Sequence, residues 1–474
     1  MIWKTAWKNV WRNKIRSLVV IVSVTIGIFG GVFAVAVMNG AIEQRVDAAL
    51  NQELGHIHIN RPGFRDNYEV GRTLPDLDEC RKILGQTPGV KAWTEHLVVT
   101  GMANTAAKST GVQIVGIDPG QEKEVLKLHE TTLPGTGDFF ESDSRRKLAY
   151  IGQDLAKELN IIRYMVDEST LDTLAALGLP EETLAKVGAW SGIRFANEKA
   201  FKKEMKRVLS PKEQRMYGAR IQSAAWSFRE RSKLTLTFLD KNNIQTGGVF
   251  RIAGIYDIRN SMYEMTQVLV PASDLRELTG LGPEDVHQLV LRLDDLDATR
   301  TVTTALQEAL PDLEVMNWKE IQPDLAMMTD LITQFYAIFM VIILAALAFG
   351  IVNTMLMVVL ERTKELGMLT AIGMNKKRVF GMIMLESVFL SLVGVTGMGV
   401  SQVIIGLTAK NGIRFSAYEE GMEAMGYTSH IFPTITPAFF VTVTLLIILT
   451  GVLSSVYPAL KALKLDPAEA LRTE

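Results

Sequence analysis

Four long apolar runs constrain the fold of this chain more than any other feature of its sequence. A helix that crosses the hydrocarbon core of a bilayer needs about 20 predominantly apolar residues. The chain has four runs of that length or more, some with extensions beyond the membrane, at residues 17–47, 326–360, 379–408 and 437–463. We therefore expect a membrane α-helical protein with four transmembrane helices per protomer.

Residues 48–325, between the first and second runs, have the composition of a water-soluble domain. Stretches such as "GHIHINRP" and "VHQLVLRLDD" predict strands, and "LDECRKILGQTPGV" and "TRTVTTALQEALP" predict helices. Two β-α-β series around one shared sheet suit a large α/β domain of the ferredoxin-like, split kind. Between them, residues 163–231 are rich in mixed charge and predict a small, mostly helical inserted subdomain.

The distribution of Lys and Arg near the ends of the runs predicts the orientation. Loops that stay in the cytoplasm carry an excess of these residues. Such an excess occurs at the amino terminus, between the second and third runs, and after the fourth, at Lys4, Lys8, Arg12, Lys14, Arg16, Arg362, Lys364, Lys376, Lys377, Arg378, Lys461, Lys464 and Arg472. Both termini are then cytoplasmic, and residues 48–325 and 409–436 lie outside.

These patterns divide the chain into nine segments. The predicted order is a cytoplasmic interfacial helix, four spans with their connections, and a cytoplasmic tail. The segments are residues 1–16 (interfacial helix), 17–47 (first span and outer extension), 48–325 (outer domain, with 48–162 and 232–325 as its α/β part), 326–360 (second span), 361–378 (cytoplasmic helix and loop), 379–408 (third span), 409–436 (short external loop), 437–463 (fourth span) and 464–474 (tail).

The amino-terminal segment has an aromatic stripe beside a cationic one. Trp3, Trp7 and Trp11 recur every four residues, so on a helix they share one face. Such a helix suits the headgroup layer of a membrane. We interpret it as an anchor for the first span, and a direct regulatory role is the alternative.

Small residues in the apolar runs indicate close helix packing. Gly, Ala and Ser let helix backbones approach each other in lipid. Candidate packing positions are Gly27, Gly30, Gly31, Ala346, Gly350, Gly394 and Gly397. Glu386 is an acid inside the third run, where an ionisable group is costly. A role at a helix interface is our preferred interpretation of Glu386, and a proton relay is the alternative.

Several classes of function find little support in the sequence. The formal net charge of −2 does not favour nucleic-acid binding. No phosphate-binding P-loop motif occurs, so no nucleotide site is expected in this chain. Cys80 is the one cysteine and cannot form an internal disulfide. His56 and His58 are two apart on a predicted strand and could bind a metal, but a solvated strand face is the preferred interpretation. We predict no catalytic residue, cofactor or metal site.

The segment "ERTKELGMLTAIGMNKKRVF" stands between the second and third runs and is too charged to cross a membrane. Pairs of opposite charge three residues apart, Glu361–Lys364 and Arg362–Glu365, favour a helix. Leu366, Leu369 and Ile372 follow at a spacing of three and predict an exposed apolar ridge. Gly373 can end the helix in a left-handed conformation. Such a ridge suits a groove on a cytoplasmic partner.

At this point the sequence resembles a known family. The stretch "NTMLMVVLERTKELGMLTAIGMNKKRVFGMIMLESVFLSLVGVTGMGV" is similar to the permease core of FtsX-, MacB- and LolC/LolE-type ABC transporter subunits. The carboxyl-terminal "YPALKALKLDPAEALRTE" resembles the same family's ending, and "AWKNVWRNKIRS" and "GQDLAKELN" also resemble its members.

The resemblance implies a four-span protomer in a dimer, in the inner membrane of a bacterium, with a periplasmic outer domain. It also implies a coupling helix from Glu361 to Met374 that docks on a separate ATPase. The residues carried over to that helix are Glu361, Arg362, Lys364, Glu365, Leu366, Gly367, Met368, Leu369, Ala371, Ile372, Gly373 and Met374.

Three features incline the resemblance towards the lipoprotein-releasing, LolC/LolE-type branch. These are the absence of a fused nucleotide-binding domain from the given sequence, a size above that of FtsX-type regulators, and the stretch "VMNGAIEQRV" before "GHIHINRPG". The insert at residues 163–231 departs from the usual outer domain. The alternatives are a MacB-like efflux permease for peptides or amphiphiles, and an FtsX-like mechanotransmitter that regulates a cell-wall hydrolase.

The partners expected from this resemblance all lie outside the chain. ATP and Mg would be bound by an ABC ATPase dimer, so the chain itself is expected to be a non-catalytic subunit. A second permease protomer, identical or related, membrane lipids, and a periplasmic carrier or adaptor protein complete the expected set. No nucleic acid is expected.

Overall fold

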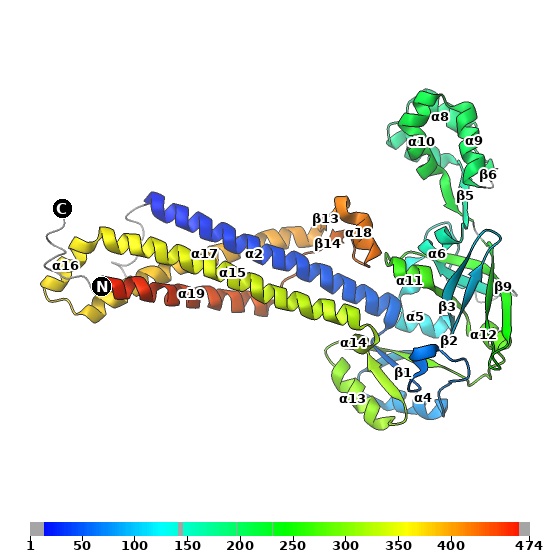
Figure 1. Cartoon of the computed structure of the whole chain (residues 1–474), viewed down its shortest axis with the longest axis horizontal. Coiled ribbons are helices and arrows are strands. Elements are labelled where there is room, and N and C mark those ends of the chain that lie inside the picture. The colour runs from blue at the N-terminus through cyan, green and yellow to red at the C-terminus, as the bar shows by residue number, and fades with distance from the viewer. Residues whose placement is uncertain (1–13, 141–145, 196, 230, 464–474) are drawn as a thin grey trace. The chain divides into compact units, whose positions relative to one another are not determined.

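The computed structural model describes residues 14–140, 146–195, 197–229 and 231–463, which form two compact units (Figure 1). The interfacial stripe of Trp3, Trp7 and Trp11 and the predicted tail at 464–474 lie outside the described residues. One unit is helical and comprises Met1–Arg45, Asp324–Glu419 and Thr428–Glu474. The other comprises Val46–Pro323 and Glu420–Tyr427 and contains most of the strands.

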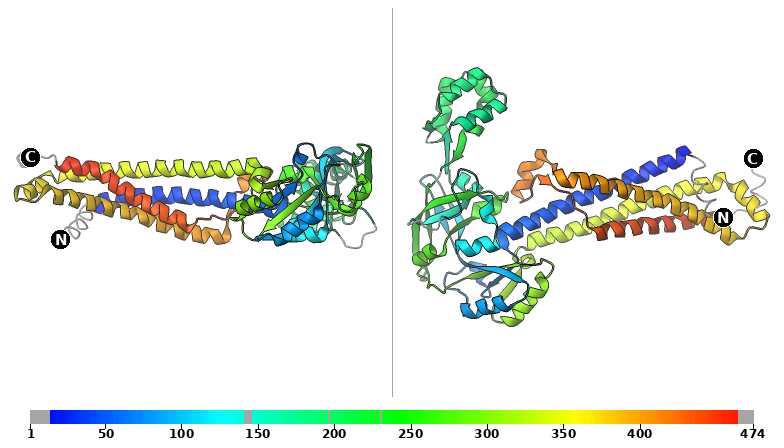
Figure 2. Two further views of the ribbon diagram at one scale, coloured as in Figure 1. Left: turned by 90° about the horizontal axis from the view of Figure 1, so that it is seen from below. Right: turned by 180° about the vertical axis from the view of Figure 1, so that it is seen from behind.

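The helical unit is built from long apolar helices that lie side by side in two views (Figures 1 and 2). They are α2 (Lys14–Ala48), α15 (Pro323–Glu361), α17 (Lys376–Asn411) and α19 (Pro437–Leu463), with the short α16 (Thr363–Ala371) between α15 and α17. Within the described chain, three helical stretches are long and apolar enough to cross a membrane, namely Val24–Leu54, Pro323–Glu361 and Pro437–Leu463. The run predicted as the third span lies within α17, and the count of four spans stays a prediction.

Side chains from all four long helices form the core of this unit. Buried members include Ile28 and Val32 of α2, Ile351 of α15, Ile383 of α17 and Ile447 of α19. The connection from α17 to α19 contains β13 (Ile413–Arg414), η3 (Ser416–Tyr418), α18 (Glu419–Ala424) and β14 (His430–Ile431), and β13 pairs with β14. The bundle thus has one continuous apolar interior.

Part of the α/β unit has the ferredoxin-like order expected from the sequence. The chain runs through β1 (Ile57–Asn60), α4 (Leu77–Gln86) and β2 (Val90–Asn104), and later through β11 (Gln288–Leu293), α13 (Thr299–Ala309) and β12 (Glu314–Asn317). These strands pair antiparallel in the order β12-β1-β11-β2. Residues between β2 and β11 separate the two β-α-β halves, as a split domain requires.

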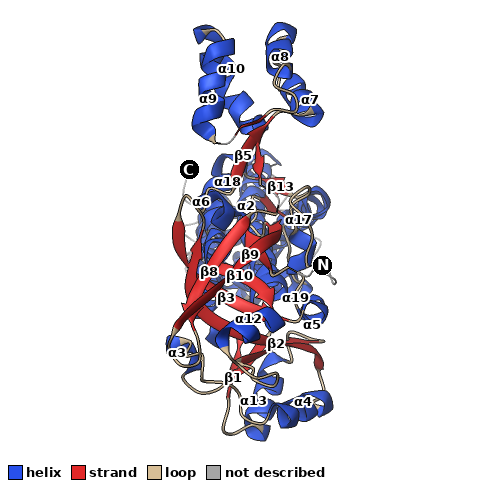
Figure 3. Ribbon diagram, turned by 90° about the vertical axis from the view of Figure 1, so that its right-hand side faces the viewer, coloured by secondary structure: helices blue, strands red, loops and turns tan. Residues whose placement is uncertain are grey.

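The other strands form a closed barrel, which the sequence analysis does not predict. They are β3 (Ser109–Ile117), β4 (Leu148–Gly152), β8 (Lys233–Leu239), β9 (Gln245–Tyr256) and β10 (Gln267–Pro271) (Figure 3). The sheet order continues β2-β3-β10-β4-β9-β8, and a further pairing of β2 with β8 closes the ring. The long strand β2 belongs to both sheets, because its first half pairs with β11 and its second half with β3 and β8.

Short helices and turns complete this unit around the two sheets. They are η1 (Ala49–Leu54), α3 (Phe64–Asn67), α5 (Pro119–Val125), η2 (Leu128–Thr131), α6 (Gln153–Glu158), α11 (Ser261–Thr266), α12 (Ala272–Thr279) and α14 (Trp318–Ile321). η1 follows α2 directly in the chain, and α14 is followed after one residue by α15. The segments through which the chain enters and leaves the α/β unit are therefore η1 and α14.

The described residues of the insert predicted at 163–231, together with Ile162, form four helices and a three-stranded sheet. The helices are α7 (Glu168–Ala176), α8 (Glu181–Gly188), α9 (Glu198–Val208) and α10 (Pro211–Ala225), and the strands are β5 (Ile162–Met165), β6 (Arg194–Phe195) and β7 (Trp226–Phe228). Ser210 caps α10 in a capping box with Glu213. Tyr164, Trp190 and Phe201 are buried in a core confined to this insert. It is therefore a separately packed subdomain.

Candidate functional site

The charged segment between α15 and α17 forms the short helix α16, and its end follows the sequence prediction. Met374 N–H donates to the carbonyl of Leu369 over 3.0 Å. Gly373 adopts φ +98°, a left-handed conformation that side chains rarely allow. Asn375 then caps α17 by accepting the N–H of Lys377 over 2.9 Å. Gly373 thus ends one helix and lets the next begin within three residues.

The prediction that Leu366, Leu369 and Ile372 form an exposed apolar ridge is wrong for the two leucines. Leu366 is only 4% exposed and belongs to the core of the bundle, and Leu369 packs against that core. Ile372 is 78% exposed and Met368 51% exposed. The exposed stripe is therefore Lys364, Met368 and Ile372, at a spacing of four, because the Leu366 face of α16 packs into the bundle core.

Arg362 joins this helix to the bundle through two ion pairs. Its Nε donates to Glu365 Oε2 over 3.0 Å, the pair expected from the sequence. Its Nη1 donates to Glu386 Oε1 over 3.0 Å, although Glu386 lies 24 residues further along the chain. The side chains of Arg362 and Glu386 are 14% and 4% exposed. One guanidinium therefore holds the α15–α16 junction against α17, and Glu386 lies at a helix interface.

The remaining residues of the predicted coupling helix lie before and after Arg362 in the chain. Glu361 is the last residue of α15, and Lys364, Gly367 and Ala371 lie in α16. Lys364 is exposed and Gly367 is buried. Met374 packs against the bundle core after the helix ends. The stripe of Lys364, Met368 and Ile372 thus combines apolar and cationic groups, and the exposed Glu361 lies before it in the chain.

Of the small residues predicted to pack closely, the structure brings only some against a neighbouring helix. A Cβ built on Gly31 would lie 2.0 Å from Ile343 of α15, and one on Gly397 would lie 3.0 Å from the Thr25 carbonyl oxygen of α2. A Cβ on Gly27, Gly30 or Gly350 would meet nothing within 4 Å among the described residues, so their close packing within one chain is not found and contact with a second chain stays a prediction. Gly27, Ala346 and Gly350 instead line an apolar groove between α2 and α15. Gly394 lies in α17.

Two close contacts were missed by the sequence analysis. A Cβ on Gly40 would lie 2.1 Å from the Phe432 carbonyl oxygen, and one on Gly451 would lie 2.2 Å from Ser391 Cβ. Gly40 lies four residues after Ala36, and Gly451 lies four residues before Ser455. Both pairs have the spacing of small residues that favours close helix packing, so this signal could have identified them.

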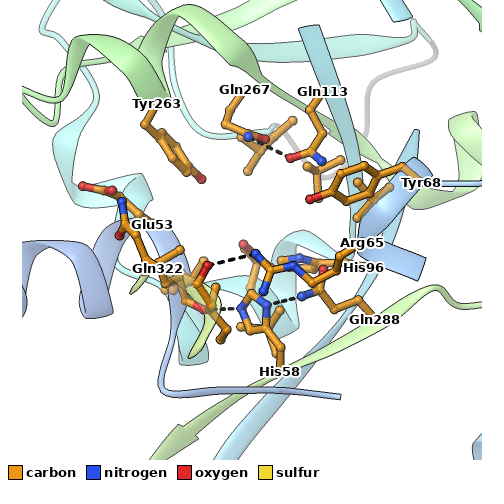
Figure 4. Close-up of a pocket in the computed structure, with 18 residues that line it drawn as sticks. Glu53, His58, Arg65, Tyr68, His96, Gln113, Tyr263, Gln267, Gln288 and Gln322 are labelled. Atoms are coloured by element: carbon orange, nitrogen blue, oxygen red, sulfur yellow. Dashed lines mark hydrogen bonds and ion pairs between the residues drawn. The ribbon is translucent and has the colours of Figure 1, made fainter. Parts of the chain in front are cut away.

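The α/β unit contains a polar cavity of about 260 Å³ (Figure 4). Its wall includes Glu53 and Leu54 of η1, Ile321 and Gln322 at α14, and side chains of β1, β2, β3 and α5. Polar side chains that line it are Glu53, His58, Arg65, Tyr68, His96, Gln113, Glu122, Tyr263, Gln267, Gln288 and Gln322. The cavity thus lies against both segments through which the chain enters and leaves this unit.

The solvated-face interpretation of the His56–His58 pair is wrong. β1 lies between β12 and β11, so both of its edges are paired, and all four of its residues are buried, with His58 8% exposed. The Nε2 of His58 lies 2.6 Å from the Leu54 carbonyl oxygen and must donate to it, while Nδ1 accepts from the Gln288 amide. The Nδ1 of His56 accepts the N–H of Leu293 over 3.2 Å. Both rings therefore serve as neutral hydrogen-bonding groups.

Burial lowers the pKa of His56 to about 4 and that of His58 to about 3. The pKa of His287, also buried, is lowered too. In the opposite sense, burial raises the pKa of Glu264 to about 7. Each neutral histidine contributes stability above its unfolded pKa of about 6.5 that is lost on acidification, whereas Glu264 contributes stability at low pH that is lost as the pH rises through about 7.

We expect the histidines to dominate the pH dependence of folding stability in mildly acidic solution. Between about pH 7 and pH 5, the lowered pKa of His58 alone reduces the free energy of unfolding by roughly 2 kcal/mol. Over the same range the raised pKa of Glu264 increases the free energy of unfolding by about as much as one such histidine reduces it. The protection of β1 and β11 amides from hydrogen exchange, corrected for intrinsic rates, should therefore fall on acidification. It should fall more steeply in Glu264→Gln, in which the offset is removed. Protection that rises from pH 7 to pH 5 in the unaltered protein would contradict this balance.

Comparison with known proteins gives matches at both ends of the chain. The family described as FtsX-like permease C-terminal matches residues 337–467, and the MacB-like periplasmic core domain matches residues 17–168. The macrolide export ATP-binding/permease protein MacB of Acinetobacter baylyi is 28% identical over 200 residues, which cover 41% of this chain and 28% of that protein. The uncharacterized ABC transporter permease YknZ of Bacillus subtilis is 26% identical over 220 residues, which cover 45% of this chain and 51% of that protein.

The matched region therefore spans about half or less of the length of these relatives. Among solved structures, the extracellular domain of the noncanonic ABC-type transporter YknZ from Gram-positive bacteria aligns with 55% of this chain and 99% of that structure. Its sequence identity is 14% and the TM-score is 0.28. The two family matches, at opposite ends of the chain, are the findings that bear on identity.

Proposed function

Because the chain belongs to the FtsX/MacB family of ABC transporter permeases, we propose that it is the non-catalytic membrane subunit of a transporter driven by a separate ATPase. The single observation that carries this proposal is the set of two ion pairs that Arg362 makes with Glu365 and Glu386, which we call the Arg362 clamp. α15 runs unbroken from Pro323, where the α/β unit ends, to Glu361, where the clamp begins. A displacement of α16 would therefore be transmitted to one continuous helix.

In this proposal the exposed stripe of Lys364, Met368 and Ile372 enters a groove on the ATPase. The long helices cross the bacterial inner membrane, both termini are cytoplasmic and the α/β unit is periplasmic, as the charge distribution predicts. The protomer pairs with an identical or related permease. ATP and Mg are bound by the ATPase, and closure of the ATPase dimer shifts the permease between two states only by its differential affinity for them.

For the cargo we propose an amphiphile taken from the outer leaflet, with lipoprotein released towards the outer membrane as the first candidate. The apolar interior of the described bundle supports an amphiphile over a small hydrophilic solute, since its buried acid, Glu386, is already paired. MacB-like efflux is a second candidate with equal support, because the MacB-like periplasmic core domain matches residues 17–168. A periplasmic carrier or adaptor protein would receive the cargo in either case.

Depletion of the chain in its own host distinguishes these candidates. Lipoprotein release predicts that outer-membrane lipoproteins accumulate in the inner membrane. Efflux predicts unchanged lipoprotein sorting and increased sensitivity to exported peptides or other amphiphiles. If neither changes and a cell-wall hydrolase binds the α/β unit, the chain is an FtsX-like mechanotransmitter and the transport proposal fails. Purification in mild detergent, with every co-eluting chain identified, tests the ATPase partner separately.

A further inference from the structure

The polar cavity presents hydrogen-bond acceptors that no described residue satisfies. Glu122 Oε2 accepts from Thr94 Oγ1 over 2.9 Å and lies 2.8 Å from His96 Nε2. Glu122 Oε1 and Gln322 Oε1 are also buried, and neither has a hydrogen-bond partner among the described residues. The Glu122 side chain is 2% exposed. A buried acceptor of this kind destabilises the fold unless a donor reaches it, and more so when it is charged.

The charges of the lining favour a cation over an anion. Two carboxyl groups, Glu53 and Glu122, line the cavity beside one guanidinium, that of Arg65, and the imidazole of His96, whose Nε2 lies 2.8 Å from Glu122 Oε2. The Nη2 of Arg65 is already engaged with the Ile321 carbonyl oxygen over 3.0 Å. His58 is held neutral by its two hydrogen bonds, as described above. An anionic ligand would therefore meet a carboxyl excess, whereas a cationic donor would find acceptors.

We propose that this cavity binds a small organic ion that carries a primary ammonium group, with its N–H groups donating to Glu122 Oε1 and Gln322 Oε1. Charge-assisted hydrogen bonds of this kind are about twice as strong as neutral ones. The volume of about 260 Å³ accommodates a short diamine or an amino acid. The amides of Gln113, Gln267 and Gln288 provide further polar contacts along the wall.

The position of the two acceptors gives this binding a structural consequence. Glu122 belongs to α5, whereas Gln322 follows α14, the segment through which the chain leaves the α/β unit. A ligand that bridges them restrains α14 against the body of the unit, beside η1, which carries Glu53. The inference concerns binding alone and does not depend on the transport proposal.

The test is isothermal titration calorimetry of the full chain in detergent with putrescine and with L-lysine. We expect saturable binding of at least one of them. Glu122→Gln should weaken it by at least about tenfold, as loss of one charged hydrogen bond predicts. Glu124→Gln is the matched control on the same helix, since Glu124 is exposed, and should leave the affinity unchanged. Gln322→Met, which removes the second acceptor, should weaken binding independently of Glu122.

Several outcomes would overturn the proposal. Tetramethylammonium has the charge but no N–H donor, so equal affinity for this ion would exclude recognition by the two acceptors. Equal affinity of Glu122→Gln and Gln322→Met with the unaltered protein would place binding elsewhere. If neither putrescine nor L-lysine gives a binding heat, the cavity does not bind a primary ammonium group and the proposal is wrong. Circular dichroism of both variants separates lost binding from lost folding.

Discussion

Ile372→Asp should abolish the association of this chain with the ATPase that we propose as its partner, while leaving the helical bundle folded. Ile372 is 78% exposed, so a charge there costs the fold little, generally within about 0.5 kcal/mol for a surface position. In a docked complex the same side chain would be desolvated in an apolar groove. Truncation of such an anchor typically costs about 2 kcal/mol or more of binding energy. A buried, unpaired carboxylate costs more.

The measurement is co-purification of the ATPase in mild detergent, with yield and thermal stability of the permease as controls. Ile372→Leu keeps an apolar side chain of the same size and should bind the ATPase normally. Leu366→Asp is not a docking variant, because Leu366 lies in the bundle core, and it should instead lower the yield of folded protein. Co-purification at the unaltered level with Ile372→Asp would contradict the docking of this stripe.

Arg362→Leu should destabilise the bundle by about 3–5 kcal/mol, the cost of leaving a buried charge without its partner. Glu386 is 4% exposed and accepts from Arg362 Nη1 over 3.0 Å. Without the guanidinium, its carboxylate would stay buried and lose this charged hydrogen bond. The melting temperature in detergent should fall by several degrees or more, and the α15–α16 junction should lose protection from hydrogen exchange.

The double variant Arg362→Leu/Glu386→Leu separates charge from packing. Replacement of a whole buried ion pair by apolar side chains is often neutral or stabilising, so the double variant should recover most of the lost stability. It should nevertheless remain impaired in transmitting a displacement of α16 to the bundle, since the ion pair between the α15–α16 junction and α17 is gone. Lys377→Leu is the control, because it removes one exposed cation that lies outside the docking stripe. If Arg362→Leu has the same melting temperature as the unaltered protein, the ion pairs of Arg362 do not stabilise the bundle.

The charged segment illustrates what periodicity can and cannot decide. Its sequence predicts a helix and the residue that ends it, because charge spacing and a glycine with positive φ act locally. Two apolar stripes fit the same helix, Leu366–Leu369 and Met368–Ile372. The choice between them depends on which face the neighbouring helices cover, and no local rule contains that information. The ridge was therefore assigned to a partly wrong face.

The glycines show the same distinction between composition and contact. Small residues are frequent in all four runs, and the sequence identifies them as candidates for close approach. Gly31 and Gly397 do face another helix, whereas Gly27, Gly30 and Gly350 do not within this chain. Gly40 and Gly451 were missed although their contacts are among the closest. Helix rotation and crossing angle decide which small residue meets a neighbour, and both depend on all four helices together.

The sequence by itself determined the properties that depend on neighbouring residues along the chain. These are the apolar runs, the ferredoxin-like series of strands and helices, the helix after Arg362 and its end at Gly373. The tertiary structure alone decided the pairing of Arg362 with Glu386, the closure of the barrel by β2 and β8, and the burial of His58 beside a polar cavity. Each of these joins residues that are distant in sequence, and their proximity depends on the packing of the whole unit. Periodicity therefore predicted the helices and strands of this protein, whereas long-range contacts determined the Arg362–Glu386 ion pair and the cavity.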